Sequence, residues 1–194
     1  TGTTGTRFLN LDARSYGLEF EGQWAPIDNL AIFLNYAYIN AKVTKGCCYL
    51  DVTDPTAIAP GARPTGAVGP GGARVQTLKG NDLPLSPDNK VTLGANYTWQ
   101  LPVGSLMLGG NVTHTASLQS TIFANPIYQA RAGDVADFRA IWKAPNGITV
   151  IASVKNAFDK VNYLSSLANP PAVTAVGVRR QVLLGFPRTY GLEL

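Results

Sequence analysis

Residues 90–100 read Lys-Val-Thr-Leu-Gly-Ala-Asn-Tyr-Thr-Trp-Gln, and every second side chain in this stretch is apolar. An alternation with period two predicts a β-strand with one apolar and one polar face. The stretch reaches Trp99 three residues before a proline, and similar alternating runs reach Trp24 and Trp142 two or three residues before their prolines. Tryptophan favours a membrane–water interface because its ring is apolar and its N–H is polar. The pattern therefore points to strands that end at such an interface.

Composition favours many short elements. Of the 194 residues 45% are hydrophobic, but only 14% are charged, against roughly 25% in soluble domains. The 20 glycines and 13 prolines disfavour long helices. No segment approaches the roughly 20 apolar residues of a membrane helix, so a membrane would have to be crossed by strands.

Seven strands are expected, at residues 15–25, 30–43, 89–100, 105–118, 132–144, 147–158 and 187–194. The connections between them alternate in length. Short turns at 26–29, 101–104 and 145–146 alternate with long loops at 44–88, 119–131 and 159–186. Asn146-Gly147 is a favoured hairpin dipeptide. Short turns on one side and long loops on the other are typical of an outer-membrane β-barrel.

Charged side chains avoid the alternate strand positions that carry the tryptophans, which form one face of each strand (one parity). A Lys or Arg at the middle of a lipid-facing surface would cost about 2–4 kcal/mol. We identify Asp134, near a long loop, as the exception to this pattern. The positions of the other parity form the polar face, which suits a watery lumen or a polar plug. That polar parity contains Glu19, Glu21, Lys90, Asp137, Arg139, Lys143, Lys155 and Glu193.

Aromatic residues gather at both ends of the expected strands and predict two membrane-interface girdles. A soluble β-sandwich would also hide one strand face and is the alternative. Strands of 11–14 residues favour the barrel, because globular strands have about 5–6 residues and tilted barrel strands about 9–11. The girdle residues are Trp24, Tyr97, Trp99 and Trp142 near the short turns, and Tyr36, Tyr38 and Phe158 toward the long loops.

Three segments resemble sequence motifs of TonB-dependent outer-membrane receptors. Residues 13–26, Ala-Arg-Ser-Tyr-Gly-Leu-Glu-Phe-Glu-Gly-Gln-Trp-Ala-Pro, resemble a late strand with a Gly-apolar-Glu-apolar-Glu-Gly core and a proline turn. Residues 156–163, Asn-Ala-Phe-Asp-Lys-Val-Asn-Tyr, resemble the end of the penultimate strand, and residues 187–194 resemble the last strand. The resemblance covers most of the chain except 44–88.

The resemblance implies an all-β, antiparallel transmembrane barrel, of which residues 1–194 would be an incomplete C-terminal set of about seven strands. Barrels of such transporters have about 22 strands, so we expect the segment to need the rest of its barrel. The terminal aromatic residue, the plug domain and the TonB-contacting motif of the family have no counterpart here. Residues 1–6 lack the regions of a signal peptide, which suggests a mature or truncated start.

The function implied is TonB-energised uptake of a scarce ligand of the siderophore, cobalamin or carbohydrate type. The implied partners are the rest of the barrel with its plug, a periplasmic TonB-type protein, outer-membrane lipid or lipopolysaccharide, and the small-molecule ligand. We expect no cofactor, metal or nucleic acid. A passive porin-like or adhesin-type barrel is the alternative function, and a soluble β-sandwich binding module is a weaker one.

Loop arginines are the candidate ligand-binding residues, because guanidinium groups bind anions and lipopolysaccharide phosphates bidentately. Solvated loop charges are the alternative interpretation. An enzyme is not expected, since the only histidine, His114, falls on the lipid-facing parity. The adjacent Cys47 and Cys48 leave open whether they are free, bridged to each other or paired elsewhere. The candidates are Arg63, Arg74, Arg131, Arg179 and Arg180.

Three acidic residues and one acidic pair have weaker functional interpretations. Asp51, Asp54 and Asp82 suggest calcium, but their spacing fits no known loop. Glu19 and Glu21 share one row on the lumen parity, which favours a contact to the wall or plug over acid–base catalysis.

Overall fold

The computed structural model describes residues 10–46, 51, 77–169 and 179–194. Arg63, Arg74, Cys47, Cys48 and Asp54 lie outside these ranges. No helix among the described residues is long and apolar enough to cross a membrane.

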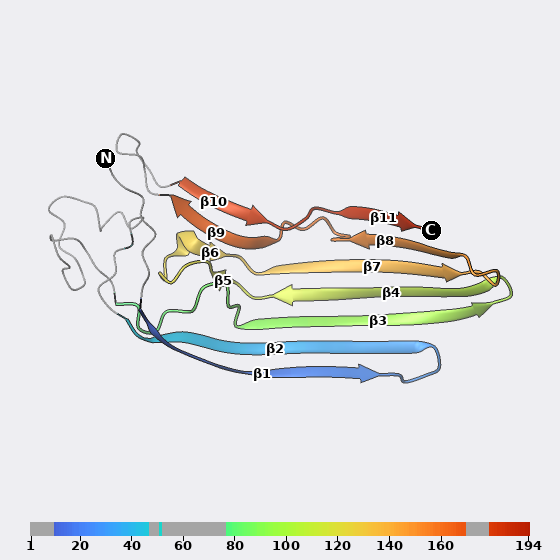
Figure 1. Cartoon of the computed structure of the whole chain (residues 1–194), viewed down its shortest axis with the longest axis horizontal. Helices are drawn as coiled ribbons and strands as arrows, with labels where there is room; N and C mark the ends of the chain where they lie inside the picture. Colours follow the sequence, from blue (N-terminus) through green and yellow to red (C-terminus); the bar gives the residue numbers. More distant parts are fainter. Residues whose placement is uncertain (1–9, 47–50, 52–76, 170–178) are drawn as a thin grey trace.

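Seven strands pair in sequence order into one antiparallel sheet (Figure 1). The sheet is an open portion of a barrel wall, with β1 and β11 at its two edges, and it confirms the predicted seven wall strands. The strands are β1 (Asp12–Trp24), β2 (Leu30–Lys45), β3 (Asn89–Leu101), β4 (Gly104–Thr115), β7 (Gly133–Lys143), β8 (Thr149–Lys155) and β11 (Thr189–Glu193).

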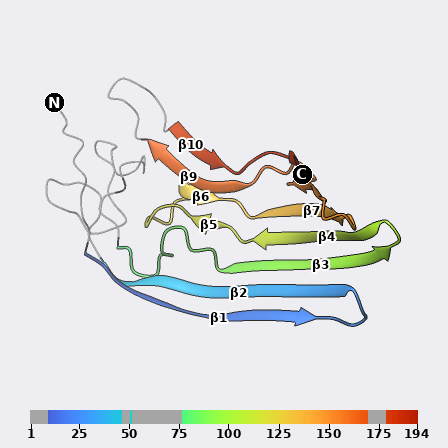
Figure 2. The ribbon, with the colours of Figure 1, turned by 45° about the vertical axis from the view of Figure 1, so that its right-hand side comes forward.

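Two small hairpins lie at the end of the sheet opposite the short turns, within connections that the sequence predicted only as loops (Figures 1 and 2). β5 (Leu118–Gln119) pairs with β6 (Gln129–Ala130), and the 3₁₀ turn η2 (Pro126–Tyr128) lies between them. β9 (Tyr163–Asn169) pairs with β10 (Arg179–Leu184). Serines and arginines interrupt the apolar alternation of β9 and β10, which is why these strands were not predicted.

The wall strands differ from the predicted bounds mainly at this same end. β4 stops at Thr115 rather than at residue 118, and β8 stops at Lys155 rather than at 158. β8 stops because Asn156 has a φ of 48°, a left-handed conformation that an extended strand cannot contain.

The short turns have the backbone conformations that their residues favour. In the β7–β8 turn Gly147 has a φ of 88°, and the Asn146 side chain accepts a hydrogen bond from the Ile148 N–H at 3.3 Å. In the β3–β4 turn Gly104 has a φ of 117°, and a Cβ at this position would meet the Lys143 carbonyl oxygen. The predicted Asn-Gly turn is confirmed.

One face of the sheet exposes a continuous set of large apolar side chains. The register places Leu34, Leu93 and Val112 in one cross-strand row, so that the exposed face continues from strand to strand. Among the described residues the buried apolar set is small and includes Val43, Leu78 and Tyr128. The exposed wall residues are Tyr16, Leu18, Phe20, Trp24, Leu34, Leu93, Trp99, Leu108, Val112, Phe138, Tyr190 and Leu192.

Polar residues on this apolar face occur near the loop end of the strands and are paired. Asp134 lies opposite His114, and its carboxylate contacts the ring Nδ1 at 2.6 Å. The prediction that Asp134 is the one charged strand residue on the apolar face is wrong. Lys42 pairs in register with Arg14 on this same face, and its Nζ lies 2.6 Å from the Asp82 carboxylate.

Candidate functional site

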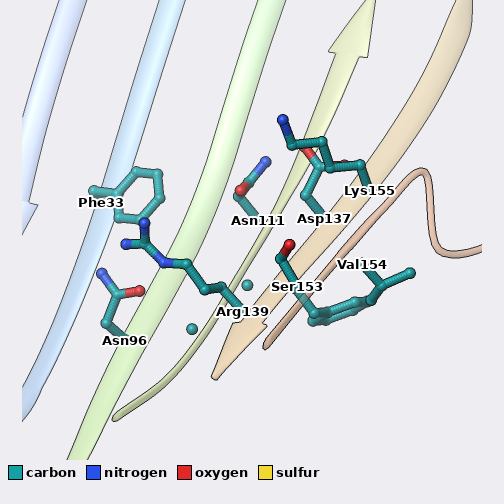
Figure 3. A pocket seen from close by; sticks show the side chains of 11 residues that line it. Phe33, Asn96, Asn111, Asp137, Arg139, Ser153, Val154 and Lys155 are labelled. Carbon is teal, nitrogen blue, oxygen red and sulfur yellow. The ribbon is translucent and has the colours of Figure 1, made fainter. Parts of the chain in front are cut away.

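The opposite face of the sheet is polar and holds a depression with a volume of about 450 Å³ (Figure 3). Asn96, Gly109 and Arg139 occupy one cross-strand row. Because Gly109 has no side chain, Arg139 can extend across the row, and Figure 3 shows it pointing toward Asn96 and Phe33. Further polar groups in the depression are Asn111, Asp137, Ser153 and Lys155.

A second depression on this face, with a volume of about 320 Å³, contains charges of both signs. Glu19 and Glu21 line it together with Lys90, and the register aligns Glu19, Ala37 and Lys90 in one row. The prediction that the two glutamates lie on the polar face is confirmed. Mixed charges on a wide wall suit a contact with another polar surface.

The predicted girdle tryptophans lie on the apolar face, close to the short turns. Trp24 is 65% exposed and Trp99 is 40% exposed. The Trp99 ring meets Tyr97 edge-on with a centroid distance of 4.5 Å. Trp142 shares a row with Leu106 and Val150. These positions are compatible with an interface girdle, and the girdle itself stays a prediction.

The aromatic residues predicted for the second girdle lie toward the long connections. The Tyr36 hydroxyl donates a hydrogen bond to Asn89 at 2.7 Å. The Tyr38 hydroxyl accepts one from Asn40 at 3.5 Å. Phe158 follows β8 and packs edge-on against Phe138 at 6.4 Å.

Three of the five candidate arginines lie within the described residues, and the side chains of Arg131 and Arg180 contact different groups. The Arg131 guanidinium lies 5.9 Å from the centre of the Tyr163 ring. Arg179 and Arg180 are neighbours in β10, so their side chains leave opposite faces of the strand. The Arg180 guanidinium donates to Ser166 Oγ and to the Gln129 carbonyl, each at 2.8 Å.

The burial of two polar side chains at the loop end was not predicted from the sequence. Ser166 is fully buried and carries no local sequence signal. Asp51, considered above for calcium, is 1% exposed and accepts hydrogen bonds from the Tyr128 hydroxyl at 2.8 Å and the Asn125 amide at 3.3 Å. Among the described residues no group of three or more His, Cys, Asp or Glu side chains can hold a metal ion.

Asn156, the first residue of the Asn-Ala-Phe-Asp-Lys block, has a structural role. It is 3% exposed, and its amide donates to the carbonyls of Lys160 at 2.8 Å and Phe186 at 3.2 Å. Its Oδ1 accepts the Lys160 N–H at 2.9 Å. Asp159 accepts the Arg188 N–H at 3.0 Å. The block therefore turns the chain out of β8 and ties it to the segment that leads into β11.

The family model described as "TonB dependent receptor-like, beta-barrel" matches residues 1–157. The chain therefore belongs to the TonB-dependent receptor β-barrel family, as the three segments suggested. A comparison with curated proteins finds no match.

Several solved receptors share the fold. The ferric yersiniabactin uptake receptor FyuA from Yersinia pestis is 17% identical, with a TM-score of 0.66 over 93% of this chain and 23% of the receptor. The siderophore receptor PiuA from Acinetobacter baumannii is 14% identical, with a TM-score of 0.63 over 93% and 21%. BauA, the ferric preacinetobactin receptor of the same organism, is 19% identical, with a TM-score of 0.59 over 93% and 21%. This chain spans less than a quarter of the length of each of these receptors.

Proposed function

We propose that this chain forms part of the wall and the ligand-facing loops of an outer-membrane receptor that uses TonB to take up a scarce ligand. The observation that carries the proposal is the division of the sheet into two faces. One face exposes Leu93, Leu108 and Leu192, whereas the other holds charged depressions. A barrel wall between lipid and a polar lumen requires this division, and membership of the receptor family agrees with it.

The same division suggests where partners bind. Unpaired backbone groups at β1 and β11 need further strands, because lipid provides no hydrogen-bond partners. The depressions at Glu21 and Arg139 offer charges of both signs to a plug domain in the lumen. The apolar face meets outer-membrane lipid, and a periplasmic TonB-type protein supplies the energy.

We assign the ligand to the siderophore class, because PiuA is described as a siderophore receptor, and FyuA and BauA are described as receptors for ferric yersiniabactin and ferric preacinetobactin. Arg131 and Arg179 are the described arginines that we assign to an anionic ligand. Arg180 holds two loop oxygens through its guanidinium. The roles of Arg63 and Arg74 stay predictions, as do cobalamin and carbohydrate as alternative ligands.

Uptake of radiolabelled iron tests the function. Cells whose outer membrane contains the assembled receptor are supplied with hydroxamate, catecholate and carboxylate ferric siderophores in turn. We expect accumulation of at least one of them, and its abolition in cells without TonB. Accumulation that continues without TonB would indicate a passive channel. No accumulation from the whole panel would contradict the assignment of the ligand class.

Neutralising an assigned arginine should weaken ligand binding. Hydrogen bonds to charged groups contribute about 1.5–3 kcal/mol, so we expect Arg179→Gln or Arg131→Gln to raise the Kd of the transported ferric siderophore by about 10- to 100-fold. Fluorescence quenching on purified receptor measures the Kd. Lys143→Gln, at the short-turn end of β7, is the matched control and should leave the Kd unchanged. An unchanged Kd in both arginine variants would remove them from the site.

A further inference from the structure

The connection between β4 and β7 lies between two other loop segments and contacts both. On one side the Leu85 N–H donates to the Gln119 carbonyl at 2.8 Å, and the Asn81 amide donates to the Ile122 carbonyl at 2.9 Å. On the other side lies the β9–β10 hairpin. Both views of the chain show β5, β6, β9 and β10 together at the loop end (Figures 1 and 2). We call residues 118–130, from β5 through η2 to β6, the central loop.

The two faces of the β9–β10 hairpin have different surroundings. Ser166 and Val182 are paired in register, and Arg180 lies two residues from Val182, so these side chains share one face. Ser166 is fully buried on this face. Arg179 and Leu183 belong to the opposite face, where Leu183 is 60% exposed. The hairpin therefore docks through the Ser166–Arg180 face and leaves Arg179 accessible.

Three hydrogen bonds join the hairpin to the central loop, and a fourth lies within the hairpin and links Arg180 to Ser166 on the docked face. The Ser166 N–H donates to Ser120 Oγ at 2.7 Å, and the Ser166 hydroxyl donates to the Ile127 carbonyl at 2.6 Å. Arg180 Nε donates to Ser166 Oγ, and Arg180 Nη2 donates to the Gln129 carbonyl. The planar guanidinium fixes the directions of both of its bonds, which a lysine ammonium cannot do.

We propose that Arg180 and Ser166 are positioning residues that hold the β9–β10 hairpin on the central loop, so that these two connections face the ligand as one body. Arg179 is then the ligand-facing member of the arginine pair. The assignment of Arg179 rests on the proposed function, whereas the docking of the hairpin does not.

Hydrogen exchange tests the docking without any ligand. In the assembled receptor in detergent, Arg180→Gln should speed exchange of the peptide containing Ser166 by roughly tenfold or more, because bonds to a charged group are lost and the hairpin opens locally. Arg179→Gln, on the opposite face, is the matched control. Exchange at Ala140 and Ala152 in the wall should stay unchanged in both variants. Equal exchange at Ser166 in the two variants would overturn the proposal.

A second set of variants separates geometry from charge. Ser166→Ala should speed exchange at the central loop, whereas Ser165→Ala on the other face should not. Arg180→Lys should behave like Arg180→Gln if the guanidinium fork positions the hairpin. Slow exchange in Arg180→Lys would overturn the positioning role, because positive charge alone would then suffice. These results hold whether or not a ferric siderophore is transported, so a failure of the proposed function is recognised separately.

Discussion

Replacing Leu93 by lysine should lower the free energy of unfolding of the assembled barrel in lipid by about 2–4 kcal/mol. Leu93 is 54% exposed on the apolar face, in the row that also contains Leu34 and Val112. It lies six residues before Trp99, roughly 20 Å along the strand, which places it well inside the apolar band. An ammonium group there would lose its hydration without gaining a partner.

The neighbouring substitution Thr92→Lys is the matched control. Thr92 faces the lumen side, in the depression that also contains Glu21 and Asn35, so a lysine there keeps polar surroundings. Urea titration of the receptor folded into lipid vesicles measures both variants. If Leu93→Lys lowers the free energy of unfolding no more than Thr92→Lys does, the assignment of the apolar face to lipid is contradicted.

Replacing Asn156 by alanine should lower the free energy of unfolding of the receptor by about 2–5 kcal/mol, because two independent effects add. The backbone groups of Lys160 and Phe186 lose the three hydrogen bonds of the Asn156 side chain, and each of these bonds contributes about 0.5–1.5 kcal/mol. Alanine at a φ of 48° adds roughly 1–2 kcal/mol of backbone strain. Asparagine tolerates this conformation better than most residues.

Asn156→Gly separates the two effects, since glycine keeps the backbone conformation but loses the side chain. We expect the glycine variant to be more stable than the alanine variant and less stable than the unsubstituted receptor. Urea titration in lipid vesicles again provides the comparison. Equal stabilities of the alanine and glycine variants would show that the backbone conformation contributes nothing.

Much of the wall could be predicted from local pattern. The alternation through residues 16–24 and 90–100 predicted β1 and β3 nearly to their ends, and the Asn146-Gly147 turn followed from its dipeptide. The pairing of His114 with Asp134 could not be predicted, because it depends on the register between β4 and β7. The position of Lys42 on the apolar face, in contrast, follows from the period of two that it shares with Tyr36 and Tyr38, and its pairing with Arg14 agrees with it.

The loop end was predicted least well. Ser165 and Ser166 are adjacent and chemically identical, yet Ser166 is buried against the central loop, whereas Ser165 pairs with Leu183 on the opposite face of the hairpin. Arg179 and Arg180 present the same ambiguity, because a period of two separates their faces without saying which face is covered.

The identity of the wall strands and their division into apolar and polar faces could therefore be predicted from the sequence alone, because the pleat of a strand is a local property of its backbone. Register, and the docking of the β9–β10 hairpin on the central loop, came only from the folded chain. They depend on hydrogen bonds between residues far apart in the sequence, such as Ser166 with Ser120 and Arg180 with Gln129. No local pattern specifies such partners.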